Sequence, residues 1–224
     1  SCCLLWDTQM EYTRLLTKYF KESYEACGGN IIAEDTFIGG TRDYGSNITR
    51  IKKLSPQPEM IYIAAGPDDI GHIVEQFRKA GVNQPIFGGD SYDTPAITNI
   101  SEKLCTGIYY TTHFLADRDN TRTKKAQLFI DRYTKEYGSP PDGFAALGYD
   151  TTMLAADAIK RADSEEPCKI LQALKGTRAF IGVSGRIIYR NNQQIPDKNV
   201  SVVAIIEGER ILVDNLMPEK IPLP

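Results

Sequence analysis

The chain has 224 residues, 42% of them hydrophobic, so it is long enough to bury a core as one large domain or two small ones. Its net charge of −3, with acidic and basic residues interspersed, provides no basic stripe for a phosphate backbone, and we expect no nucleic-acid partner. No apolar run reaches the ~20 residues of a membrane span, and Ser1 begins directly at a predicted strand without a leader. We therefore expect a soluble chain whose start is already processed or truncated.

The first half of the chain alternates strands with helices. Short apolar runs predict strands at residues 2–6, 30–33, 60–64 and 85–87. Apolar side chains at helical spacing predict helices at residues 9–27, 43–54 and 68–80, the second of them capped by Asp43 or Ser46. This alternation predicts an α/β fold with a parallel, doubly wound sheet and right-handed crossovers.

Two of these helices have a recognisable apolar face, which we expect to point toward the core. The face of the first consists of Tyr12, Leu15, Leu16, Tyr19, Phe20 and Tyr24. The face of the third consists of Ile70, Ile73, Val74 and Phe77.

The second half of the chain changes character after a fifth predicted strand at residues 107–112. Residues 118–122 are polar and charge-rich, and we expect a hinge there. Helices are predicted at residues 124–137, 142–161 and 167–174. Strands are expected at residues 185–189, 200–207 and 210–213, with turns at 191–192 and 207–208.

Five cysteines, an odd number without a C-x-x-C pair, indicate neither a zinc site nor a redox pair. Buried structural thiols are the favoured interpretation. A disulfide from Cys2 or Cys3 to Cys27 stays open for an oxidising compartment, because Cys27 closes the helix that follows their strand. We expect no metal and no other cofactor.

Two predicted strands end abruptly in glycine and polar residues, in IYIAAGPDD at 61–69 and FGGDSYD at 87–93. In a parallel sheet the carboxyl ends of the strands lie at one edge, where ligands collect. We therefore expect Gly66, Asp90 and Tyr92 on one rim, beside the loop after the first strand and near Tyr12.

An enzymatic alternative rests on Asp68, Asp69 and His72, which lie within one helical turn. Carboxylates and a histidine at this spacing can hold a metal or polarise a nucleophile. Acids in the first turn are better explained by the favourable dipole at a helix N-terminus. The sequence contains no G-x-S-x-G, H-E-x-x-H, P-loop or G-x-G-x-x-G motif, so we expect a protein that is not an enzyme.

Six segments along the chain carry a family resemblance when they are taken together. They are DTQMEY at 7–12, DY at 43–44 before IKK at 51–53, QFRKAG at 76–81, FGGD at 87–90, FAALGYD at 144–150 and GVSG at 182–185. In this order the chain resembles the type I periplasmic solute-binding proteins of the leucine/isoleucine/valine-binding family. The resemblance covers essentially the whole chain, so it is more specific than any single motif.

The resemblance implies a two-lobed protein that binds an amino acid or a similar small ligand between its lobes by hinge closure. Such proteins are the periplasmic or extracytoplasmic receptors of ABC importers, and their partner is the membrane permease of the importer. A ligand-sensing domain of the same fold in a receptor or regulator is the alternative.

The resemblance also implies a division of the chain. Residues 1–115 correspond to lobe two, residues 116–184 to helices of lobe one, and residues 185–224 to strands that return to the hinge and lobe two. The opening half of lobe one has no counterpart. We therefore expect the helices at 124–161 to leave apolar faces uncovered, which would associate with a missing N-terminal segment or with a second copy. These faces consist of Ala126, Phe129, Ile130, Tyr133, Leu147, Met153, Leu154 and Ala158.

Family ligand-contact positions correspond to Asp90 and Tyr12. Asp90 stands where the family places an acidic partner for the ammonium group of an amino acid, and such charge-assisted hydrogen bonds strengthen in a closed cleft. The alternative is that Asp90 caps the turn after its two preceding glycines. Tyr12 stands at an aromatic contact position, and its alternative is a core aromatic beside Leu15 and Leu16.

The remaining expected contacts come from three places. Gly66 and Pro67 stand near a position that is usually aromatic in the family, which implies a roomier pocket or a backbone contact. Tyr92 is expected to supply the lost surface, or else to be an exposed loop tyrosine. Phe144 corresponds to a pocket wall from lobe one, or else to a helix-core residue.

Overall fold

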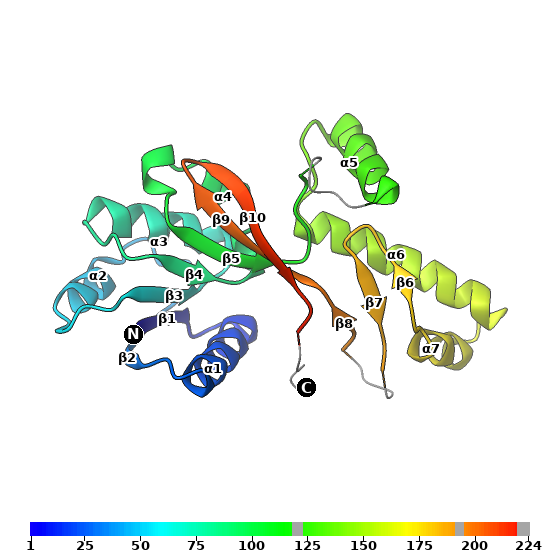
Figure 1. Ribbon diagram of the computed structural model, residues 1–224, viewed down its shortest axis with the longest axis horizontal. Helices are drawn as coiled ribbons and strands as arrows, with labels where there is room; N and C mark the ends of the chain where they lie inside the picture. The colour runs from blue at the N-terminus through cyan, green and yellow to red at the C-terminus, as the bar shows by residue number, and fades with distance from the viewer. Residues whose placement is uncertain (118–122, 191–194, 219–224) are drawn as a thin grey trace. The chain divides into compact units, whose positions relative to one another are not determined.

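The computed structural model of the chain describes residues 1–117, 123–190 and 195–218 and contains two compact units (Figure 1). Unit 1 comprises Ser1–Thr111 and Val203–Ile211, and unit 2 comprises Thr112–Val202 and Leu212–Pro224. The hinge expected at 118–122 and the turn expected at 191–192 lie outside the described residues. How the two units correspond to the predicted lobes stays a prediction.

Unit 1 is built on a parallel sheet. The parallel strands are β1 (Cys2–Asp7), β2 (Ile31–Phe37), β3 (Met60–Ala64), β4 (Ile86–Gly88) and β5 (Ile108–Thr112), in the order β2–β1–β3–β4–β5. β9 (Val200–Ile206) and β10 (Glu209–Leu216) continue the sheet beyond β5 and bring it to seven strands. The predicted α/β fold with a mainly parallel sheet is confirmed.

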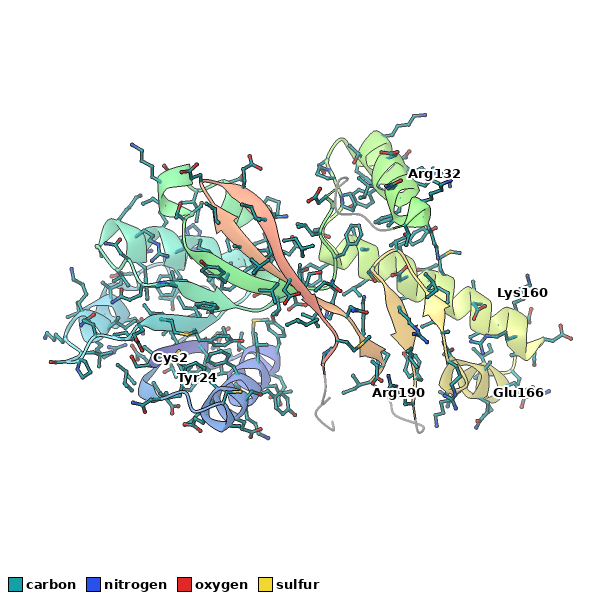
Figure 2. The ribbon with its side chains drawn as sticks, viewed as in Figure 1. Cys2, Tyr24, Arg132, Lys160, Glu166 and Arg190 are labelled. Atoms are coloured by element: carbon teal, nitrogen blue, oxygen red, sulfur yellow. The ribbon has the colours of Figure 1, made fainter. Side chains whose placement is uncertain are left out.

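One face of this sheet is covered by α1 (Glu11–Ala26) (Figure 1). Leu16, Phe20 and Tyr24 of α1 pack against side chains that alternate along β1 and β3. These strand residues are Cys2, Leu4, Tyr62 and Ala64. Figure 2 shows Tyr24 beside Cys2.

The buried face of α1 differs in part from the predicted one. Leu15 is 39% exposed, whereas Thr13 and Thr17 are buried. The Thr13 hydroxyl donates a hydrogen bond to the carbonyl of Asp7 at 2.7 Å, which joins the start of the helix to the end of β1. A threonine can be buried when its hydroxyl has a hydrogen-bond partner. The pattern of apolar residues alone therefore predicted the buried face of α1 incorrectly.

The other face of the sheet is covered by α3 (Pro67–Lys79), and all four of its predicted core residues are fully buried (Figure 1). α2 (Gly45–Lys52) begins after Tyr44, without a side-chain cap. The prediction that Asp43 or Ser46 caps this helix is therefore wrong. The Asp43 carboxylate instead accepts a hydrogen bond from the Gly45 N–H at 2.8 Å, one residue inside the helix.

Several short elements were not predicted, because the sequence shows no periodic pattern for them. They are α4 (Pro95–Thr98), β6 (Phe180–Ile181), β8 (Asp197–Lys198) and two 3₁₀ turns, at Asp90–Tyr92 and Glu102–Leu104. A segment of two to four residues is too short to show either helical or strand spacing.

Unit 2 contains α5 (Lys124–Tyr137), α6 (Gly143–Ala162) and α7 (Pro167–Lys175), together with an antiparallel sheet in the order β6–β7–β8, where β7 is Arg186–Ile188. Its core consists of Phe114, Ala126, Phe129, Ile130, Ala146 and Val183. The expectation that α5 leaves its apolar face uncovered is therefore wrong, because this face packs inside the unit. On α6, Leu154 and Ala158 are also buried, whereas Met153 is 39% exposed.

A buried carboxylate holds the loop that follows β6. Asp150 of α6 accepts hydrogen bonds from the N–H groups of Val183 at 2.7 Å and Ser184 at 2.8 Å, and from the Ser184 hydroxyl. A Cβ atom on Gly182 would overlap this carboxylate, so glycine is required there. This contact explains why the segments FAALGYD and GVSG occur together.

All five cysteines lie within the described residues, and all are free thiols. A disulfide to Cys27 is therefore not formed. Cys2, Cys3 and Cys105 are buried, as the favoured interpretation expected, but Cys27 and Cys168 are exposed. Burial raises the pKa of the Cys2 thiol to about 11 and that of Cys3 to about 12, which makes both poor nucleophiles at neutral pH.

Replacing Asp150 by alanine should lower the free energy of unfolding of unit 2 by about 3 kcal/mol, since two buried N–H groups lose their acceptor. Circular dichroism during urea unfolding measures this loss, because three helices belong to this unit. The control is Asp157→Ala on the same helix, which removes an exposed ion pair with Arg161 and should cost about 0.5 kcal/mol or less. Equal costs for the two substitutions would contradict the anchoring role of Asp150.

Candidate ligand-binding site

The carboxyl ends of β1, β3 and β4 lie at the same edge of the sheet, because these strands pair in parallel. The loops that follow them carry Met10, Gly66 and Asp90. This edge is where ligands bind in open α/β sheets.

Tyr12 and Asp90 meet at this edge. The Tyr12 hydroxyl donates a hydrogen bond to Asp90 Oδ1 at 2.5 Å and accepts a longer one from the Ser91 N–H at 3.4 Å. Burial, followed by the charge of Asp90, raises the pKa of Tyr12 well above its ordinary value. The hydroxyl therefore stays protonated at neutral pH and acts as the donor.

The two alternatives for this pair do not hold. The turn at Asp90–Tyr92 is closed by its backbone, because the Asp93 N–H donates to the Asp90 carbonyl at 2.9 Å, and the Asp90 carboxylate bonds Tyr12 instead of capping the turn. Tyr12 is half-buried, with its hydroxyl at the rim, and so it is not a core aromatic. Leu15, its expected core neighbour, is exposed.

Two glycines allow this close approach. A Cβ atom on Gly89 would lie 2.6 Å from the Tyr12 hydroxyl oxygen, and one on Gly88 would overlap the ring of Tyr92. The segment FGGD is thus explained by the packing of two tyrosines against the backbone of one loop.

Tyr92 is a core residue, so both interpretations made from the sequence are wrong. Its side chain is fully buried, and its hydroxyl donates to the carbonyl of Ile63 at 2.7 Å. Burial raises its pKa well above the ordinary value. The sequence around a tyrosine that follows two glycines does not distinguish an outward-pointing side chain from an inward-pointing one. In the structure, the hydrogen bond of Tyr92 connects the Asp90 loop to β3.

Gly66 is buried and immediately precedes α3, and Pro67 is exposed at the first position of that helix. A Cβ atom on Gly66 would lie 3.3 Å from Met10 Sδ. The Met10 side chain, 38% exposed, therefore stands beside the glycine. Sequence analysis did not select Met10, because a methionine in a loop carries no signal of its own.

Phe144 belongs to unit 2 and stands in the first turn of α6, where the Asp142 carboxylate caps the helix by accepting the Ala145 N–H at 2.7 Å. The side chain of Phe144 is 50% exposed. The helix-core alternative is therefore wrong, and its role as a pocket wall stays a prediction.

The acids considered for an enzymatic site have a structural role or are exposed. Asp69 accepts hydrogen bonds from the Gly40 N–H at 3.1 Å and from the Tyr44 hydroxyl at 3.3 Å, which fastens the loop before α2. Asp68 and His72 are exposed. The described residues contain no group of three or more His, Cys, Asp or Glu side chains that could hold a metal ion.

Unit 2 has a cavity of about 270 Å³ of its own, which sequence analysis did not anticipate. Phe114 and Val183 line it, together with a row of amides in which Asn199 donates to Asn215, and Asn215 to Ser201. None of the predicted site residues lines this cavity.

A parallel sheet with a charged group fixed at its carboxyl edge is typical of solute-binding folds. The family model described as "Periplasmic binding protein" matches residues 3–210, and the chain belongs to this family. Because this is a family of binding proteins, the prediction that the chain is not an enzyme is confirmed.

Solved structures agree with this assignment. The chain is similar to a leucine-binding protein of Thermotoga maritima, with 28% identity and a TM-score of 0.88 over 97% of this chain and 61% of that chain. It is also similar to the branched-chain amino-acid transporter substrate-binding protein of Streptococcus pneumoniae in complex with isoleucine, with 27% identity and a TM-score of 0.85 over 97% of this chain and 60% of that chain.

Curated relatives are more distant and longer. A leucine-, isoleucine-, valine-, threonine- and alanine-binding protein of Pseudomonas aeruginosa is 22% identical over 77% of this chain and 44% of its own length. The chain thus spans about half the length of the curated relatives that it matches. Among the described residues, none of the helices is long and apolar enough to cross a membrane.

Tyr12→Phe and Asp90→Ala should show strong coupling in unfolding experiments, because either substitution removes the same hydrogen bond to a charged group, worth about 1.5 kcal/mol or more. Urea unfolding followed by the fluorescence of Trp6, the single tryptophan, measures the coupling on β1 of unit 1. Tyr19→Phe, also on α1, is the control and should be additive with Asp90→Ala. Additive losses for Tyr12→Phe would contradict the pairing.

Proposed function

We propose that the chain is part of the extracytoplasmic, periplasmic solute-binding component of an ABC importer, and that it binds an amino acid or a similar small ligand. The observation that supports this most directly is the Asp90 carboxylate, held at the ligand edge of the sheet by Tyr12. A fixed carboxylate is suited to an ammonium group, with which it forms charge-assisted hydrogen bonds.

The geometry of this carboxylate favours a cationic group on the ligand. Tyr12 bonds one carboxylate oxygen, and among the described residues no hydrogen bond to Oδ2 of Asp90 occurs. Asp90 is half-buried, so its second oxygen is available to a ligand that excludes water from the edge. Two similar proteins, of Streptococcus pneumoniae and Desulfitobacterium hafniense, were solved with isoleucine and with Leu, both of which carry an ammonium group.

We further propose that the ligand is enclosed by hinge closure between two lobes, with Phe144 as a wall from the lobe opposite Asp90. The exposed ring of Phe144 supports this. Half of its surface is exposed, so it is not a core residue of unit 2, and the start of its helix is already capped by Asp142. Delivery of the ligand to a membrane permease completes the proposed role.

The surface of α6 supports a further protein layer in the complete molecule. From Gly143 to Ala156 its single charged residue is Asp150, which is buried. Phe144, Tyr149 and Met153 are exposed on this stretch, at 50%, 38% and 39%. Exposed apolar side chains gathered along one helix are typical of an interaction surface, so we propose that an N-terminal segment of the complete protein or, in its absence, a second copy covers α6.

In a two-lobed protein that contains these residues, Asp90→Asn should weaken isoleucine binding by roughly 10- to 150-fold, the loss expected for charge-assisted hydrogen bonds of 1.5–3 kcal/mol. Isothermal titration calorimetry measures the change. Asp68→Asn, which removes an exposed acid from the start of α3, is the matched control and should leave the affinity unchanged. Unchanged affinity in Asp90→Asn would refute the ammonium-binding role.

The 224-residue chain alone should bind isoleucine weakly and should associate beyond its monomer mass of 25.0 kDa. Light scattering tests this directly. Ile159→Lys, on the exposed side of α6, should reduce association, whereas Leu128→Lys, at an exposed leucine on α5, should not. A monodisperse monomer with tight isoleucine binding would overturn the proposed second layer.

A further inference from the structure

The loop that carries Asp90 is held a second time, three residues further on. The Asp93 carboxylate, only 2% exposed, accepts a hydrogen bond from Arg210 Nη1 at 2.8 Å. Arg210 Nη2 donates to the carbonyl of Thr94 at 3.2 Å. Arg210 lies on β10, 117 residues further along the chain, so this contact joins the C-terminal hairpin to the Asp90 loop within unit 1.

Arg210 donates hydrogen bonds to the Asp90 loop alone within the described residues. Its Nε has no hydrogen-bond partner there, and both terminal nitrogens bond the segment Asp93 to Thr94. A guanidinium presents its donors in a planar fork, so two contacts to adjacent residues fix both the position and the orientation of the backbone. An arginine at this position therefore constrains the loop more than a lysine would.

The residues between the Tyr12 contact at Asp90 and the Arg210 contact at Asp93 form a short turn. Asp90, Ser91 and Tyr92 form a single 3₁₀ turn, and the hydroxyl of Tyr92 is bonded to β3 below it. Only Ser91 and Tyr92 separate Asp90 from Asp93, so the position of Asp93 constrains the position of Asp90. Replacing Arg210 should also be costly, since the buried Asp93 carboxylate would lose a charged partner.

We infer that Arg210 is a positioning residue for Asp90: through Asp93 and Thr94 it sets the place of the turn that presents the Asp90 carboxylate to Tyr12 and to the ligand. The ligand part of this inference rests on the proposed function, whereas the part that concerns Tyr12 does not. Under this inference, the hairpin of β9 and β10 helps to position the candidate binding site through Arg210.

The test measures the coupling between Tyr12 and Asp90 when Arg210 is replaced. In an Arg210→Met background, the coupling between Tyr12→Phe and Asp90→Ala in urea unfolding should be lost. The matched control is Arg78→Met, because Arg78 is also a half-buried arginine of unit 1 that bonds backbone carbonyls, among them those of Val82 and Gln84. Arg78→Met should lower stability and leave the coupling intact.

A second variant keeps the test decisive if Arg210→Met does not fold. Arg210→Lys retains the charge but loses the planar fork, so only part of the coupling should remain. Coupling that persists unchanged in both Arg210 variants, or that is lost equally in Arg78→Met, would overturn the inference, because Arg210 would then act only on overall stability.

Isoleucine binding provides an independent measurement in the two-lobed protein. Arg210→Met should weaken binding roughly tenfold in the presence of Asp90 and should have little further effect in the Asp90→Asn background. If Asp90→Asn leaves binding unchanged while the Tyr12 coupling still depends on Arg210, the proposed ammonium-binding role of Asp90 fails and the part of the inference that concerns Tyr12 stands. If Asp90→Asn weakens binding but Arg210→Met alters neither binding nor coupling, the inference fails and the proposed function stands.

Discussion

The hydrogen bond from Tyr12 to Asp90 is the interaction on which the candidate site depends. Parallel pairing brings the loops after β1 and β4 to the same edge of the sheet, but it does not connect them. The hydroxyl of Tyr12 makes this connection, and its raised pKa keeps it a donor. A carboxylate on a short turn without such a donor would retain its rotamer freedom, and a ligand would have to supply the ordering free energy itself.

Buried carboxylates organise both units in the same way. Asp7 accepts the Gly39 N–H at 2.9 Å, Asp69 accepts that of Gly40, and Asp150 accepts two N–H groups of the loop after β6. In each case a loop N–H group obtains a carboxylate acceptor. These three acidic residues therefore hold loops in place. Lys198 shows that burying a charged group carries a cost. Burial lowers the pKa of Lys198 to about 8, although the nearby charge of Asp150 opposes that change.

Sequence patterns predicted those features that repeat over a long enough segment. α3 and α5 were found nearly to the residue, because an apolar face recurs over more than three turns in each. The meeting of Tyr12 and Asp90 also followed from the alternation of strands and helices. Tyr92 was misplaced, since its burial depends on the space that Gly88 leaves for its ring. Arg210 could not be found from local pattern at all, because its partner Asp93 is 117 residues away in the chain.

The two sides of the candidate site place different demands on a ligand. The Asp90 carboxylate is bonded by Tyr12 of α1, and Arg210 of β10 bonds Asp93 in the same loop, so under the proposed function Asp90 selects for charge and direction. Gly66 and Met10 lie at the neighbouring strand ends, where a glycine backbone is flanked by a flexible thioether that can adapt to different apolar shapes. A site of this kind discriminates strongly for the ammonium group, because a misplaced charge in a closed cleft is costly, and weakly among apolar side chains that differ by a methylene. Under the proposed function, the bonded carboxylate and the adaptable thioether would suit a group of related amino acids better than a single one.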